Sequence, residues 1–210
     1  MPYDRRGRGD SGDTAPYAVD REVEDLAAVL DAVGGSAAVY GHSSGAGLVL
    51  HAVAAGLPVD RIVLHEPPYS PDDAESRDEA RRFALELRAL LAAGARGEAV
   101  ELFVRATGAP DEVVAALRAD PALLAVAPTL AYDSAVMGDL DGGAVPEDLV
   151  AAAQLPGLVL AGGDSPPFVL DVARRVADLL LDGRLHVPPG QGHVVDPEVL
   201  APVVADFLAG

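Results

Sequence analysis

The residues best suited to chemistry form a Gly-x-Ser-x-Gly turn at 41–45, with Ser43 at its centre. The apolar stretch 37–40 before the turn predicts a strand, and the Ala/Gly/Leu-rich stretch after it predicts a helix. A serine on such a sharp turn projects its hydroxyl from the carboxyl end of a sheet, where it can act as a nucleophile. The backbone N–H of Ser44 would face a developing oxyanion at the helix N-terminus.

The turn alone has a second interpretation, an ordinary glycine turn, because the chain contains 22 Gly. Gly41 and Gly45 lack Cβ, which would let the turn tighten and the helix approach the strand. A nucleophilic serine also needs a base and an acid. His193 follows the last apolar stretch of the chain, and several carboxylates lie between it and Ser43. This order favours nucleophilic catalysis over a structural turn.

Strands and helices alternate around these residues. Strands are expected at 37–40, 61–65, 157–161 and 184–188, and helices at 23–33, 46–55, 169–179 and in a terminal segment whose first turn would hold Pro202. The stretch 61–65 is apolar without alternation, so both of its faces should be covered, as in a parallel sheet. Residues 70–150 show only helical patterns. We therefore expect a core formed by residues 1–66 and 154–210, with residues 67–153 as a helical cap; an independent helical domain is the alternative.

Five features occur in the order typical of one family. They are the loop Asp4–Ser11, the turn at 41–45, the helical insertion, the strand ending in Gly162-Gly163, and Gly192-His193 after the last strand. With them the chain resembles, over essentially all of its residues, a capped α/β-hydrolase of the serine esterase and haloperoxidase-like superfamily. The resemblance implies an α/β fold with a mostly parallel sheet flanked by helices and a helical cap insertion.

The resemblance also implies roles for individual residues. Ser43 matches the nucleophile, and His193 matches the base that takes the serine proton and returns it to the leaving group. The family acid follows the strand at 158–161, so Asp164 is the first candidate, although the family spacing places the acid nearer Ser165. Glu66, at the end of the preceding strand, is the alternative acid. A third candidate acid is Asp133.

The chain departs from the family at its front. In the family, strands precede the Asp4–Ser11 loop, and a His-Gly loop on one of them supplies the second oxyanion donor. No residue before Gly41 resembles that site, so the chain is expected to be N-terminally truncated, with the Ser44 N–H acting alone. Loss of one such donor lowers turnover by about 10²–10³-fold. Open sheet edges would also favour homo-oligomers.

Composition excludes several classes of function. The formal net charge is −18 and all 15 basic residues are Arg, so we expect neither nucleic acid nor anionic membranes as partners. The chain has no Cys, no apolar run of the ~18 residues that a membrane span needs and no leader-like segment, so a cytoplasmic protein is expected. No histidine spacing indicates a metal and no glycine-rich motif indicates a nucleotide, so no cofactor is implied.

These observations predict a cofactor-independent serine hydrolase acting on a small ester, thioester or related acyl compound. Ser43 would form an acyl-enzyme, and His193 would activate the water that releases it. His42 would line the pocket, while His51, His65 and His186 are expected to be structural. The alternative function is a catalytically weak or inactive hydrolase-like module that binds a ligand or self-associates.

Overall fold

The computed structural model describes residues 1–210, which divide into two compact units. The first, called the helical unit, contains residues 1–18 and 73–143. The second, called the sheet unit, contains residues 19–72 and 144–210. The sheet unit is therefore formed by two segments of the chain, which are separated in sequence by the helical residues 73–143.

The sheet unit is built on four parallel strands in the order β1-β2-β3-β4, with β1 and β4 outermost. These strands are β1 (Ala37–His42), β2 (Val59–His65), β3 (Pro156–Leu160) and β4 (Asp182–His186). Their last residues are in register, because His42 pairs with His65, His65 with Leu160, and Leu160 with His186. The loops that follow the four strands therefore start from one edge of the sheet.

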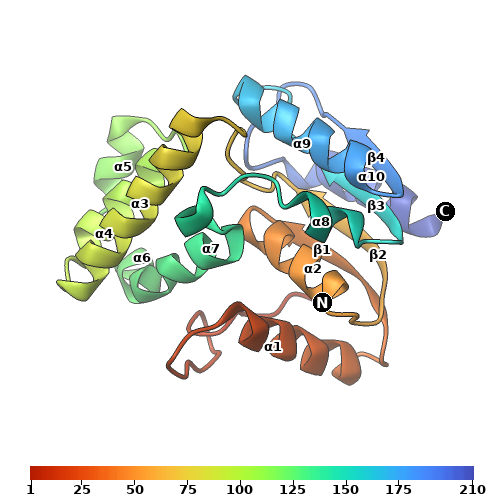
Figure 1. Ribbon diagram of the computed structural model, residues 1–210, viewed down its shortest axis with the longest axis horizontal. Helices are drawn as coiled ribbons and strands as arrows, with labels where there is room; N and C mark the ends of the chain where they lie inside the picture. The colour runs from red at the N-terminus through yellow and green to blue at the C-terminus, as the bar shows by residue number, and fades with distance from the viewer. The chain divides into compact units, whose positions relative to one another are not determined.

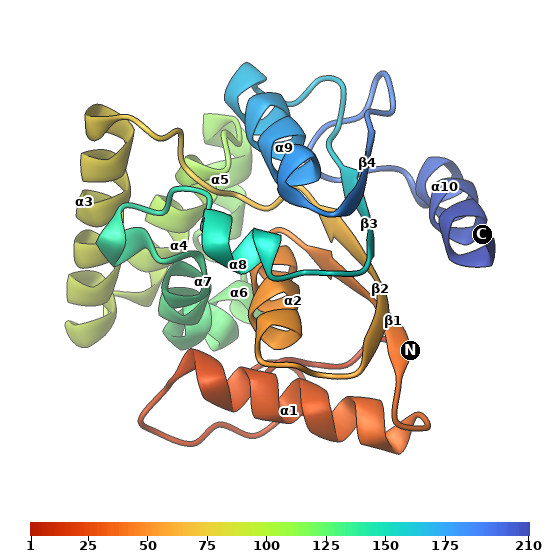
Figure 2. The same cartoon turned by 45° about the vertical axis from the view of Figure 1, so that its right-hand side comes forward.

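Helices cover both faces of this sheet, which confirms the α/β class. Figure 2 shows α2 and α9 on one face and α10 on the other. The helices of the unit are α1 (Val19–Ala32), α2 (Ser44–Ala54), α8 (Glu147–Ala151), α9 (Pro167–Leu179) and α10 (Pro197–Ala209). Phe207 of α10 packs with Val63 on one face of β2. Ile62 and Leu64 are buried as well, so both faces of β2 are covered, as the unbroken apolar stretch 61–65 predicted.

The terminal helix begins differently from the prediction. Pro202 lies inside α10 and not in its first turn. Pro197 occupies the first turn, and the Asp196 side chain caps the helix by accepting a hydrogen bond of 2.8 Å from the Glu198 N–H. An aspartate cap followed by proline is a strong start signal, so the helix begins upstream of Pro202.

The helical unit contains no strand, as its patterns predicted. Its helices are α3 (Ala74–Ala92), α4 (Arg96–Ala106), α5 (Asp111–Leu117), α6 (Pro121–Val126) and α7 (Leu130–Met137), with short turns η1 (Ala127–Thr129) and η2 (Asp139–Asp141). Helices α3 and α4 lie side by side (Figure 1) and share a core around Leu87 and Val100. No single helix is long and apolar enough to cross a membrane; only the bent pair Asp111–Leu117 and Pro121–Met137 reaches the required length and composition when combined.

The N-terminal loop belongs to the helical unit, although residues 1–66 were predicted to belong to the core. Arg5 Nη1 lies 2.8 Å from Asp133 Oδ1, and Arg8 Nη2 lies 2.6 Å from Asp133 Oδ2. The Tyr17 ring stacks on that of Tyr132 at 3.8 Å. These contacts join segments more than 110 residues apart, so no local pattern in the sequence could indicate them.

Candidate active site

Ser43 lies between β1, which ends at His42, and α2, which begins at Ser44. Its backbone angles are φ 55° and ψ −127°, a conformation that non-glycine residues rarely adopt and that costs about 1–3 kcal/mol. The Ser43 N–H donates to the His65 carbonyl at 2.8 Å, which ties the turn to β2. Ser43 is partly exposed, and its hydroxyl makes no hydrogen bond, to His193 or to any other residue.

Gly41 makes this turn sterically possible. A Cβ at Gly41 would lie 2.7 Å from the backbone nitrogen of Ala46 and closer still to the Gly45 carbonyl oxygen. Neither backbone atom can move away without displacing the start of α2. A Cβ at Gly45 would meet nothing within 4 Å. The close approach of helix and strand therefore requires only the first glycine of the motif.

His193 is paired with Glu66. Its Nδ1 atom lies 2.6 Å from Glu66 Oε2, and the Glu66 side chain is buried. The other carboxylate oxygen, Oε1, accepts hydrogen bonds from the Gly162 N–H at 2.7 Å and the Ser165 hydroxyl at 2.5 Å. Burial raises the pKa of Glu66, but these three hydrogen bonds outweigh it and lower the pKa to about 2. An ionised Glu66 accepts the Nδ1 proton of His193, which leaves Nε2 to exchange protons with a substrate or nucleophile.

Strand register explains how Glu66 reaches His193. Glu66 directly follows β2, has φ 45°, and its N–H donates to the Leu160 carbonyl at 2.9 Å. Gly162, after β3, allows the loop after β4 to pack closely, because a Cβ there would lie 2.5 Å from the Gln191 carbonyl oxygen. The three loops therefore meet at one edge of the sheet and bring His193 to Glu66.

The structure does not pair His193 with Asp164, the first-choice acid. Asp164 is exposed, and its carboxylate makes no hydrogen bond or ion pair. Its backbone N–H instead donates to the Gln191 carbonyl at 2.8 Å, which helps to hold the loop that carries His193. Asp133, the third candidate, lies in the helical unit with Arg5 and Arg8. Glu66, the alternative candidate, is the carboxylate in contact with His193.

Ser44 is the first residue of α2. Backbone N–H groups in the first turn of a helix point out of its end and favour negative charge there. The position of Ser44 at the start of α2 matches the sequence, and its role as an oxyanion donor stays a prediction. No group of His, Cys, Asp and Glu side chains in the chain is arranged to hold a metal ion.

Two sets of contacts around the His193–Glu66 pair were not predicted from the sequence. The first is Ser165 and Gly162, which hold Glu66; the Gly162-Gly163 pair directly after a strand was the available signal. The second is a contact between histidines: His42 Nε2 lies 2.9 Å from the His193 carbonyl oxygen. Its signal was a histidine directly before the proposed nucleophile.

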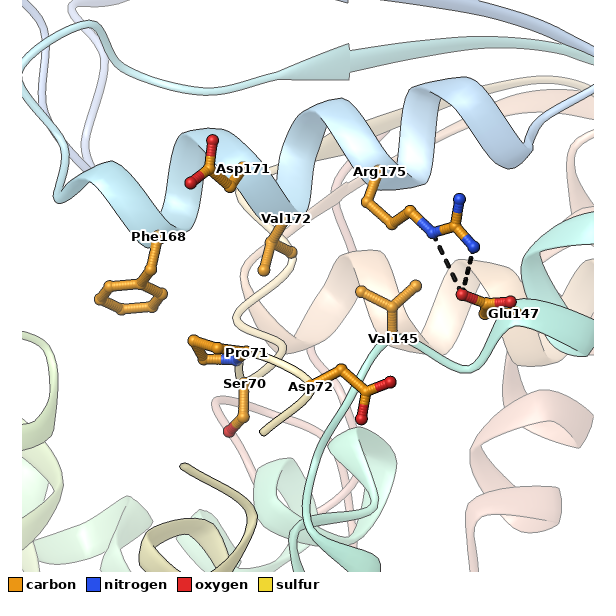
Figure 3. A pocket seen from close by; sticks show the side chains of 9 residues that line it. All are labelled: Ser70, Pro71, Asp72, Val145, Glu147, Phe168, Asp171, Val172 and Arg175. Atoms are coloured by element: carbon orange, nitrogen blue, oxygen red, sulfur yellow. Dashed lines mark hydrogen bonds and ion pairs between the residues drawn. The ribbon is translucent and has the colours of Figure 1, made fainter. Parts of the chain in front are cut away.

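A separate cleft of about 330 Å³ lies within the sheet unit (Figure 3). Arg175 of α9 forms an ion pair with Glu147 of α8 on one wall of the cleft. Phe168 also belongs to α9 and lies near the start of that helix. Ser43, Glu66 and His193 do not line this cleft. Its lining combines apolar and charged side chains: Ser70, Pro71, Asp72, Val145, Glu147, Phe168, Asp171, Val172 and Arg175.

Comparisons with known proteins agree with this fold. A family model described as "Alpha/beta hydrolase family" matches residues 1–203, so the chain belongs to the alpha/beta hydrolase family. It is similar to the crystal structure of an alpha/beta hydrolase from Sphaerobacter thermophilus DSM 20745, with 45% identity, a TM-score of 0.82, and coverage of 98% of this chain and 80% of that chain.

More distant structures share the fold alone. MenH from S. aureus is 16% identical with a TM-score of 0.69, covering 98% of this chain and 81% of that one. An esterase from Exiguobacterium antarcticum is 14% identical with a TM-score of 0.70, covering 99% and 80%. A comparison with curated protein sequences found no match. Membership of the family establishes the fold and does not identify a substrate.

Proposed function

We propose that this protein is a serine hydrolase that cleaves a small ester, thioester or related acyl substrate, with Ser43 as nucleophile, His193 as base and Glu66 as acid. The observation that carries the proposal is the hydrogen bond of 2.6 Å between His193 Nδ1 and Glu66 Oε2, formed at the sheet edge where Ser43 adopts its strained turn. Strained non-glycine backbone is concentrated at active sites, because the surrounding structure must hold it in place.

The reaction would proceed in two stages. His193 Nε2 takes the proton of Ser43 Oγ as that oxygen attacks the substrate carbonyl carbon, and the Ser44 N–H faces the resulting oxyanion. The imidazolium then protonates the leaving alcohol or thiol, which leaves an acyl-serine. His193 then deprotonates a water molecule that attacks the acyl carbon. The bond from that carbon to Ser43 Oγ breaks as the imidazolium returns the proton to Oγ, and the carboxylic acid is released. Ionised Glu66 stabilises the imidazolium in both stages and fixes the tautomer of His193.

The charge of the chain restricts the substrate class. A net charge of −18 repels polyanions and lowers the local concentration of anionic substrates. We therefore expect neutral or cationic acyl compounds to react faster than anionic compounds of the same size. Rates for matched neutral and succinylated esters at low and high salt measure this preference.

The primary test is turnover of 4-nitrophenyl acetate by the wild type and by Ser43→Ala, together with labelling by a fluorophosphonate probe. We expect the probe to label Ser43 in the wild type, and turnover to fall to the level of His193→Ala when Ser43 is replaced. Equal rates for the wild type and Ser43→Ala would end the proposal. A folded wild type that takes no label would instead favour a ligand-binding module.

A further inference from the structure

His42 is joined to the proposed base by both its ring and its hydrogen bond. Its Nε2 atom lies 2.9 Å from the His193 carbonyl oxygen, and the two ring centroids are 4.6 Å apart at 36°. A backbone carbonyl can only accept, so His42 Nε2 must carry a proton and donate it. This bond fixes both the tautomer of His42 and the backbone of the residue that carries the base.

His42 contacts His65, which is itself bonded to Tyr40. His65 is its cross-strand neighbour in register, with ring centroids 4.5 Å apart. The Tyr40 hydroxyl lies 2.6 Å from His65 Nδ1, which restrains the His65 ring. His65 is buried, and its Nε2 atom has no hydrogen-bond partner, an arrangement that costs free energy and that the surrounding contacts must offset.

His42 and His65 are both uncharged at neutral pH, because their surroundings lower their pKa values. Burial, and then the charge of His193, lower the pKa of His42 below its usual value, and the bond to the His193 carbonyl only partly opposes this. Burial, and then His42, lower the pKa of His65 to about 4. At neutral pH neither ring therefore competes with His193 for a proton, and neither repels a charged His193.

We propose that His42, braced by His65 and Tyr40, is a positioning residue that holds His193 at the sheet edge through the hydrogen bond to its carbonyl oxygen. This inference rests on the proposed function of Ser43 and His193. The loop of His193 is also held by the Asp164 N–H, which donates to the Gln191 carbonyl oxygen. The His42 side chain ties this loop directly to the end of β1, one residue before Ser43.

The test compares substitutions that separate the hydrogen bond from the ring. His42→Phe keeps an aromatic ring and removes the donor, whereas His42→Gln keeps a donor at the same reach. We expect kcat on 4-nitrophenyl acetate to fall about 10- to 100-fold in His42→Phe with little change in KM, because small displacements of a reacting group cost this much. His42→Gln should recover most of the loss. His186→Phe, outside the site, is the matched control.

A second readout is independent of turnover. The Nδ1 proton of His193, shared with Glu66, should give a far-downfield NMR signal that disappears in Glu66→Gln. We expect it to broaden or shift in His42→Phe and to persist in His42→Gln. Wild-type kcat and an unchanged signal in His42→Phe would overturn the inference. Failure of the proposed function has a different signature, since Ser43→Ala would then turn over substrate like the wild type while the NMR comparison still tests His42.

Discussion

His193 Nδ1 lies 2.6 Å from Glu66 Oε2, whereas the carboxylate of Asp164 contacts no hydrogen-bonding group. If Glu66 is the acid, Glu66→Gln should lower kcat by about 10³–10⁴-fold, the loss typical of removing the carboxylate of a triad. Asp164→Asn should change kcat little. Steady-state kinetics on 4-nitrophenyl acetate for the two variants decide between the carboxylates, and the reverse result would return the role to Asp164.

The depressed pKa of Glu66 predicts how its contribution to stability depends on pH. A carboxyl group whose pKa is lowered by folding contributes stability above its unfolded value, and that contribution is lost as pH falls through the folded value. For Glu66 the window runs from 4.5 down to about 2. The difference in Tm between the wild type and Glu66→Gln should therefore be largest above this window and shrink within it. A constant difference down to the lower limit would contradict a charged Glu66.

Ser165 should act through Glu66. Its hydroxyl donates to Glu66 Oε1 at 2.5 Å in a buried site, and hydrogen bonds to charged groups contribute about 1.5–3 kcal/mol. We expect Ser165→Ala to lower kcat about 10-fold, because the Gly162 N–H still holds the carboxylate. Ser36→Ala is the control, since Ser36 donates to the exposed carboxylate of Asp60 at 3.1 Å. Equal kinetics for the two variants would show that Ser165 does not position Glu66.

The fold could be predicted from the sequence because its signals are local. The unbroken apolar run of β2 indicated a strand buried on both faces, and the glycines around Ser43 indicated a tight strand-to-helix turn. The predicted start of α10 at Pro202 was wrong, although proline is favoured in the first turn of a helix. The Asp196 cap followed by Pro197 is the stronger start signal. Elements that are determined by residues adjacent in the sequence can be predicted in this way.

The pairing at the site could not be read in the same way. Glu66 and Asp164 both follow parallel strands, so spacing alone places either near His193. The pairing depends on the positive φ of Glu66 and on the close approach at Gly162, which are tertiary features. The association of the N-terminal loop with the helical unit depends on ion pairs to Asp133 from residues more than 120 positions away.

Asp133 should support the fold of the helical unit and not the reaction. Its buried carboxylate pairs with both Arg5 and Arg8, and removing one partner of a buried ion pair costs about 3–5 kcal/mol. Asp133→Asn should therefore lower the free energy of unfolding strongly while kcat of the folded fraction is retained. Asp78→Asn, which breaks the exposed pair with Arg81, should cost less than about 1 kcal/mol. Urea unfolding followed by circular dichroism measures both, and equal small losses would contradict the structural role.

The two glycines of the Ser43 turn should respond oppositely to the same substitution. A Cβ at Gly41 meets the backbone of Gly45 and Ala46, which cannot yield without moving α2, whereas a Cβ at Gly45 meets open space. Overpacking of this kind costs about 1–3 kcal/mol or more, so Gly41→Ala should lower Tm and displace the Ser43 hydroxyl.

Gly45→Ala should instead keep or raise Tm, because alanine is favoured over glycine inside a helix by about 1 kcal/mol. Thermal unfolding and fluorophosphonate labelling of both variants test the pair together. We expect Gly41→Ala to lose labelling even where it remains folded, since the strained backbone of Ser43 depends on the close approach of α2 to β1. Normal labelling of a folded Gly41→Ala variant would show that the reactivity of Ser43 does not depend on the geometry of this turn.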